Sequence, residues 1–227
     1  MIPVQRTSMP LVLQRNAAGW QTALDAVLRL PNATKKDIAK AQNKYRHHTV
    51  KQALIAMFHG KCAYCESKIT VVTYGSIEHF YPKSAYVALT FSWENLLLAC
   101  DICNDSGHKG AQFPLDRGGR PLLIDPTDGV IDPRSHLDFV WDAVAGLASI
   151  FGRDERGRTV ELTFDLNGIR GRRELIDHRS RYVRRLFALL RFAQQGDAEA
   201  AVLLREAVQP DAEYCAFARV YIQPYLS

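Results

Sequence analysis

Four of the five cysteines in this 227-residue chain form two Cys-x-x-Cys pairs. The pairs are Cys62 with Cys65 and Cys100 with Cys103. Each pair forms a tight knuckle whose thiolates face one ion, and two knuckles complete a tetrahedron. A thioredoxin-like redox site explains one pair but not two. The spacing therefore predicts a structural Zn²⁺, whereas Cys215, in an apolar helical pattern, is expected in the core.

Between the knuckles lie Glu78 and His79, two side chains that suit phosphodiester hydrolysis. This reaction needs a base for the attacking water and a cation that neutralises developing charge. A neutral His79, with an ordinary pKa of about 6.5, is the expected base, so activity should fall below roughly pH 6 to 6.5. In a strand the two side chains point to opposite faces, so they serve one phosphate only if the chain bends there.

Other polar residues near this pair have expected roles in the same reaction. Asn95 is expected to hold the imidazole in one tautomer, or else to cap the segment LLLAC. Asn104 and His108 share a face if they lie on one helix, and both would then reach a catalytic Mg²⁺ or Mn²⁺ beside Glu78. Lys83 and Lys109 are expected to contact phosphate, with solvated lysines as the alternative.

The order Glu-His, then a central asparagine, then Cys-x-x-Cys-Asn resembles the HNH endonuclease motif. That motif is a metal site of two strands and one helix that cleaves phosphodiester bonds. The resemblance implies that His79 is the first motif histidine, Asn95 the central asparagine and Asn104 the final His-or-Asn position. It also implies that Glu78 is the acidic ligand of the catalytic ion.

A wider set of segments is similar to one group of HNH proteins, the PtuB-like nucleases of Septu and retron-associated anti-phage systems. The segments are KCAYCE, IEHFYPKS, WENLLLACDICN, LLIDPTDG with DPRSHL, and ELTFDLNG, and the likeness runs from about residue 45 to about residue 185. The resemblance implies an ABC/SMC-like, PtuA-like ATPase as partner, and in retron systems a reverse transcriptase and its DNA. The chain has no GxxxxGK[ST] motif, so any nucleotide dependence is expected to come from that partner.

The composition, 47% apolar and 23% charged with a net charge of +5, favours a globular protein with an anionic partner such as DNA or tRNA. No secretory signal and no apolar run of about 18 residues is present, so we expect a cytoplasmic protein with no membrane span. Eight arginines lie between residues 170 and 191. Arg181, Arg184 and Arg185 are expected to bind a nucleic-acid backbone, or else to solvate an outer helix face.

The predicted fold class is α+β: a mainly helical protein with an embedded ββα-metal module that carries the four-cysteine zinc site. We expect a helical region at residues 1–59, with helices starting at Asn16 and after Pro31, and a nuclease core at residues 60–116. Residues 117–227 are expected to form a strand meander over 139–166, with turns at Gly146 and around residues 153–157, then helices packed on the core. The alternative function is a zinc-stabilised nucleic-acid-binding or assembly subunit without its own catalysis.

Overall fold

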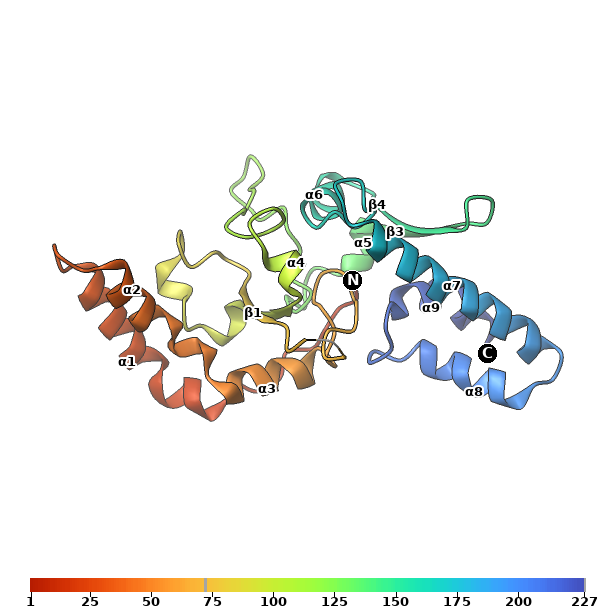
Figure 1. The fold of residues 1–227 in the computed structure, drawn as a ribbon, viewed down its shortest axis with the longest axis horizontal. Helices are drawn as coiled ribbons and strands as arrows, with labels where there is room; N and C mark the ends of the chain where they lie inside the picture. The colour runs from red at the N-terminus through yellow and green to blue at the C-terminus, as the bar shows by residue number, and fades with distance from the viewer. Residues whose placement is uncertain (72, 227) are drawn as a thin grey trace.

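The structure of this protein is a computed structural model that describes residues 1–71 and 73–226. Over these residues it is mainly helical, with two small antiparallel sheets (Figure 1). The α-helices are α1 (Leu11–Leu28), α2 (Lys35–Gln42), α3 (His48–Met57), α4 (Asp101–Asn104), α5 (Pro133–His136), α6 (Glu155–Thr163), α7 (Arg173–Gln194), α8 (Ala198–Ala207) and α9 (Cys215–Tyr221). The strands are β1 (Ser76–His79), β2 (Leu96–Ala99), β3 (Leu137–Asp142) and β4 (Leu147–Gly152), and the 3₁₀ helices are η1 (Asn43–Arg46), η2 (Val87–Leu89), η3 (Trp93–Asn95) and η4 (Gln223–Tyr225).

The N-terminal region is helical, as predicted, but its helix boundaries differ from the expected ones. Helix α1 begins directly after Pro10, whose backbone is extended with ψ 140°. Asn16 lies inside the helix instead of capping it, and its Nδ2 donates to the carbonyl oxygen of Val12. The expected helix after Pro31 is interrupted. His47 has an extended backbone, with φ −62° and ψ 140°, which ends η1 and starts α3. Tyr45 of η1 contacts His79 of the module described next.

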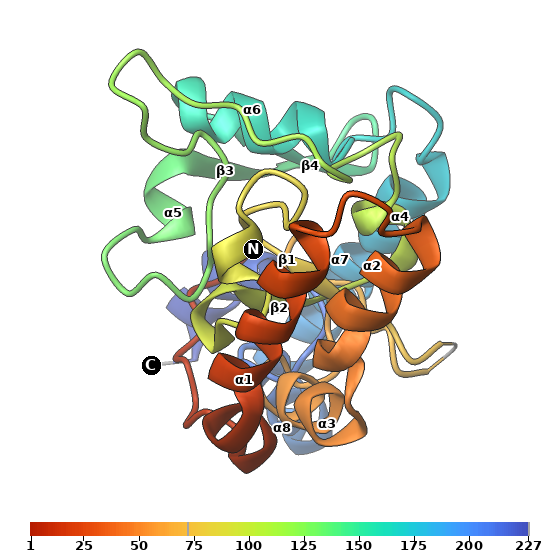
Figure 2. The same ribbon diagram turned by 90° about the vertical axis from the view of Figure 1, so that its left-hand side faces the viewer.

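The predicted ββα module is confirmed. Strand β1 pairs with β2, with Ser76 opposite Ala99 and His79 opposite Leu96, and α4 follows directly. All four residues of β2 are buried because the strand runs through the main core. Figure 2 shows α1, α2 and α3 in front of this hairpin, while α6 and the β3–β4 hairpin cover another side.

The C-terminal third departs from the predicted strand meander. The β3–β4 hairpin turns at Gly146 as expected, but the segment after it is helix α6 and not a third strand. Asp154 caps this helix by accepting a hydrogen bond of 2.8 Å from the backbone N–H of Gly157. Gly157 is required by close packing, since a Cβ there would lie 1.9 Å from the carbonyl oxygen of His136. The expected turn around residues 153–157 is therefore wrong, because Gly157 lies inside α6.

The main hydrophobic core joins residues from all three predicted regions, from Leu13 of α1 through Leu97 of β2 to Phe217 of α9. A second cluster, which includes Leu186, Leu190 and Leu204, lies where α7 packs on α8. None of the helices within residues 1–71 and 73–226 has the length and apolar character needed to cross a membrane.

Candidate active site and metal centre

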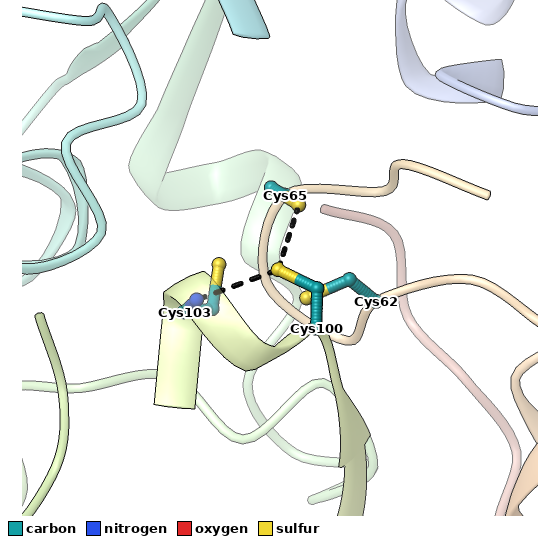
Figure 3. A group of neighbouring side chains, drawn as sticks. All are labelled: Cys62, Cys65, Cys100 and Cys103. Atoms are coloured by element: carbon teal, nitrogen blue, oxygen red, sulfur yellow. Dashed lines mark hydrogen bonds between the residues drawn. The ribbon is translucent and has the colours of Figure 1, made fainter. Parts of the chain in front are cut away.

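The thiols of Cys62, Cys65, Cys100 and Cys103 converge on one point (Figure 3), with their sulfur atoms all within 4.8 Å of one another. The Sγ atoms of Cys65 and Cys100 are 3.9 Å apart. Four sulfurs at about 2.3 Å from a tetrahedral Zn²⁺ would be separated by about 3.8 Å, so the cluster has the size of a structural zinc site.

The two knuckles are held together by the module itself. The first is attached to β2 by a hydrogen bond of 2.8 Å from the N–H of Ala63 to the carbonyl oxygen of Leu98. The second begins α4, because Cys100 Sγ accepts the N–H of Cys103 at 3.4 Å and so serves as the helix cap. Both pairs of thiols therefore lie at the end of one β-strand.

A buried arginine, Arg172, lies against the cluster. Its Nη1 donates to Cys103 Sγ at 3.3 Å and to the carbonyl oxygen of Phe164 at 2.5 Å. Burial alone would lower the pKa of Arg172, but the negative charge of Cys103 and Cys65 in their thiolate form outweighs burial and raises it. A permanent cation at this place favours thiolate over thiol, which is the state that zinc requires.

His79 ends β1, and both its ring and its tautomer are fixed by neighbours. The side chain is 6% exposed, and Nε2 lies 2.9 Å from the carbonyl oxygen of Thr90. A carbonyl only accepts, so Nε2 carries the proton and Nδ1 is left as the basic nitrogen. The ring of Tyr45 meets the imidazole edge to face, with centroids 4.5 Å apart.

Burial also decides the protonation state of His79. It lowers the pKa of the imidazole to about 4. The hydrogen bond to the Thr90 carbonyl raises this pKa, and the positive charge of Lys83 lowers it further. The sequence predicted that activity falls below roughly pH 6 to 6.5, because it assumed an ordinary histidine pKa. The lowered pKa of the buried ring moves the expected fall to a lower pH. The ring is therefore a neutral base throughout the physiological pH range.

Asn95 binds the loop that follows His79 with its whole side-chain amide. Oδ1 accepts the N–H of Tyr81 at 2.7 Å, while Nδ2 donates to the carbonyl oxygens of Tyr81 at 3.0 Å and Leu89 at 3.1 Å. The tautomer itself is set by Thr90 and not by Asn95. Asn95 thus acts on the imidazole through the loop that carries Thr90.

Glu78 is buried and paired with Lys109. Lys109 Nζ lies 2.5 Å from Glu78 Oε1 and also donates to the carbonyl oxygen of His79 at 2.8 Å. Burial raises the pKa of Glu78 and lowers that of Lys109, and their mutual attraction opposes both shifts. The structure does not place Lys109 as a phosphate contact, because its side chain is fully buried and its ammonium is already bound.

Asn104 and His108 do not share a helix face, which corrects the expectation from their spacing. Helix α4 ends at Asn104, and His108 turns back so that its Nδ1 lies 3.0 Å from Asp105 Oδ1. The Asp-Ser-Gly sequence stops the helix, since these residues favour turns. His108 lines a separate cavity beside the cysteine cluster, whereas Asn104 remains next to Glu78 and His79.

A cleft of about 520 Å³ opens over this pair of β1 residues. Its walls hold Glu78, His79 and Asn104 from the module together with three cations, Arg46, Lys51 and Lys83. Arg46 and Lys51 come from η1 and α3, which sequence reasoning left without any role. The only available signal was the basic and aromatic run NKYRHH ahead of the first knuckle.

The arginine-rich segment divides into buried and exposed members. Arg181, Arg184 and Arg185 are exposed on α7, at the opposite end of the molecule from α1 and α2 (Figure 1). Arg172 and Arg179 are buried, and Arg179 donates to the carbonyl oxygens of Ala148 and Leu166 at 2.7 and 2.9 Å. Because Arg172 and Arg179 are buried, these two of the eight arginines do not belong to a surface groove for a nucleic-acid backbone.

Comparisons with known proteins found similarity for the module and for a wider part of the chain. Residues 62–110 match the family model described as HNH endonuclease. The chain is 36% identical over 167 residues to Septu protein PtuB of Bacillus mycoides (strain KBAB4), covering 61% of this chain and 55% of that protein. It is 34% identical over 119 residues to Septu protein PtuB of Bacillus thuringiensis, covering 52% of this chain and 41% of that protein. The chain thus spans about half the length of the curated relatives it matches. Residues 62–110 thus match the HNH endonuclease model, and over about half of its relatives' length the chain is similar to Septu PtuB proteins.

Proposed function

We propose that this protein is a metal-dependent HNH endonuclease that cleaves nucleic-acid phosphodiester bonds as an effector of an anti-phage defence system. The observation that carries the proposal is His79, a buried neutral imidazole whose Nε2 is bound to Thr90 and whose ring lines a basic cleft. Both relatives are named for Septu, and their names do not mention a retron.

In the proposed reaction, His79 Nδ1 takes a proton from the attacking water. The hydrogen bond from Nε2 to the Thr90 carbonyl stabilises the imidazolium that forms, because a carbonyl dipole favours the charged ring. Arg46 and Lys83 in the cleft neutralise the phosphate that approaches His79.

Glu78 and Asn104 are the residues that would hold a catalytic Mg²⁺ or Mn²⁺. They line the cleft beside His79, and Lys109 lies against only one of the two carboxylate oxygens of Glu78. One carboxylate and one amide fit Mg²⁺, which usually keeps several waters and takes other ligands from substrate phosphates. The ion would supply stabilisation of negative charge on the leaving oxygen.

We also propose that the four-cysteine cluster holds structural Zn²⁺ and that nucleic acid has two contact regions. Lys83 belongs to the cleft, and Arg181, Arg184 and Arg185 form an exposed basic face on α7. The Septu resemblance adds an ABC/SMC-like ATPase as partner. Co-expression with such an ATPase, followed by size-exclusion chromatography, tests the partner; separate elution at micromolar concentration would count against it.

The central test compares two identical substitutions at different histidines. His79→Asn removes the base, so cleavage of plasmid DNA or tRNA in Mn²⁺ should fall by about 10² or more. His59→Asn is the matched control, since His59 is exposed and lies outside the cleft, and asparagine accepts its positive φ of 54°. Wild-type cleavage by His79→Asn would reject the nuclease and favour the binding or assembly subunit.

A further inference from the structure

Tyr45 lies outside the matched HNH domain but touches the proposed base. It is 3% exposed, and its ring packs edge to face against His79 with an interplanar angle of 89°. Tyr45 belongs to η1, so the N-terminal helical region supplies one wall of the site. The imidazole is therefore held between the Thr90 carbonyl and an aromatic ring from outside the domain.

The hydroxyl of Tyr45 binds two cations. Lys83 Nζ donates to Tyr45 Oη at 3.1 Å, and Arg46 Nε lies within 3.4 Å of the same oxygen. Lys83 Nζ is 4.9 Å and Arg46 Cζ 5.9 Å from the ring centroid, so both cations also interact with the ring. Because both partners only donate, neither uses the hydroxyl hydrogen, which can be donated to an anion.

The charge of the cleft is strongly one-sided. Arg46, Lys51 and Lys83 line it. Among the described residues of its lining, Glu78 is the only acidic one, and its charge is matched by Lys109. Two cations held at one phenol oxygen repel each other, and an anion bound between them would relieve that repulsion. Lys51 stays apart from the pair, because its Nζ donates to the carbonyl oxygen of Gly75.

We propose that Tyr45, Arg46 and Lys83 form a phosphate clamp that holds a backbone phosphate of the nucleic acid against His79. In the clamp, Tyr45 is a positioning residue that aims the two cations, and Arg46 and Lys83 bind the phosphate. The clamp reads phosphate and not base sequence, because it presents only positive charge and one hydroxyl. This inference rests on the proposed function and adds how the substrate is gripped.

Binding is measured without cleavage, in buffer with no added Mg²⁺ or Mn²⁺ and no chelator, so that the proposed structural Zn²⁺ stays in place; the readout is fluorescence anisotropy of a labelled DNA duplex and a labelled tRNA over a series of salt concentrations. Arg46→Gln and Lys83→Gln should each weaken binding to both probes. Each should also reduce the slope of log K against log salt for the duplex by about 0.9, the value for one lost phosphate contact. Arg205→Gln on α8 is the control, because this exposed arginine lies outside the cleft and should leave the slope unchanged.

The positioning role of Tyr45 is tested by Tyr45→Phe, which keeps the ring against His79 and removes the hydroxyl. The change should raise KM more than it lowers kcat and leave the melting temperature close to that of the wild type. Adding Tyr45→Phe to Lys83→Gln should cost less than the sum of the two single effects, since the two residues act on one phosphate. Full additivity would show that Tyr45 does not act through Lys83.

The outcomes separate this inference from the proposed function. Wild-type affinity and salt slope in both Arg46→Gln and Lys83→Gln would overturn the clamp, even if His79→Asn abolishes cleavage. Failure of the wild type to bind either probe at low salt would overturn it as well. If the two variants lose binding as expected but the wild type cleaves nothing in Mn²⁺, the clamp stands and the nuclease proposal fails.

Discussion

The cysteine cluster and the His79 cleft are built at opposite ends of one β-hairpin, yet they are completed in different ways. All four thiols come from residues 62–103, and the cluster closes within the module. The cleft takes His79 and Glu78 from β1 but takes Tyr45 and Arg46 from the N-terminal helices. The cysteine cluster is thus a local structure, whereas the cleft exists only when two regions of the chain pack together.

Removing one thiol of the cysteine cluster should have the largest effect on folding of all the substitutions considered for the two sites. Cys100→Ala leaves three ligands, so the free energy of zinc binding, on the order of 10 kcal/mol, is largely lost from folding. We expect insoluble or unfolded protein with less than one Zn²⁺ per chain by metal analysis. Cys215→Ala, a buried thiol outside the cluster, is the control and should fold with its zinc. A folded, zinc-free Cys100→Ala would contradict the metal centre.

Lys109→Met should strongly destabilise the cleft side of the hairpin. It leaves the buried Glu78 carboxylate unpaired, a loss that typically costs about 3 to 5 kcal/mol in free energy of unfolding. Urea denaturation measures the change, and adding Glu78→Gln should recover part of it. Lys83→Met is the matched control, because Lys83 is half-buried in the cleft and makes no ion pair with Glu78. Equal stability of the two variants would refute the pairing.

The pH dependence of stability should report the buried imidazole. Folding lowers the pKa of His79 from 6.5 to about 4, so the unfolded chain binds more protons between these values. Stability is fully present above about pH 6.5 and is lost as the pH falls, by about 3 kcal/mol near pH 4. The difference between wild type and His79→Asn isolates this loss from protonation of the thiolates. Parallel curves for the two proteins would show that His79 is not buried as described.

Asn95→Ala should give the smallest effect. It leaves the N–H of Tyr81 without its acceptor, at a cost of about 1 to 3 kcal/mol, and loosens the loop before Thr90. Asn95→Asp keeps that acceptor but replaces the Nδ2 donor with an oxygen that faces the carbonyl oxygens of Tyr81 and Leu89, so it should be destabilised more than Asn95→Ala. Cleavage should fall in the same order, because the loop sets the tautomer of His79. Full activity of Asn95→Ala would show that Thr90 holds the imidazole without help.

Local patterns predicted several elements correctly. Spacing placed the four cysteines together, and the HNH resemblance predicted the ββα module that the fold contains. The turn at Gly146 was also predicted correctly, because a short hairpin is decided by a few neighbouring residues. Helix α6 was missed because Gly157 is needed for contact with His136, a residue distant in sequence.

By itself, the sequence determined which residue types are available for chemistry, since thiol spacing and the Glu-His pair are local properties of the chain. Only the tertiary structure decided how they are used. In the structure Lys109 pairs with Glu78 and is not free for a phosphate, and His108 contacts Asp105 instead of sharing a helix face with Asn104. Tyr45 packs against His79. These outcomes depend on burial and on contacts between segments distant in sequence. A local sequence pattern therefore does not predict which buried charged groups pair with each other.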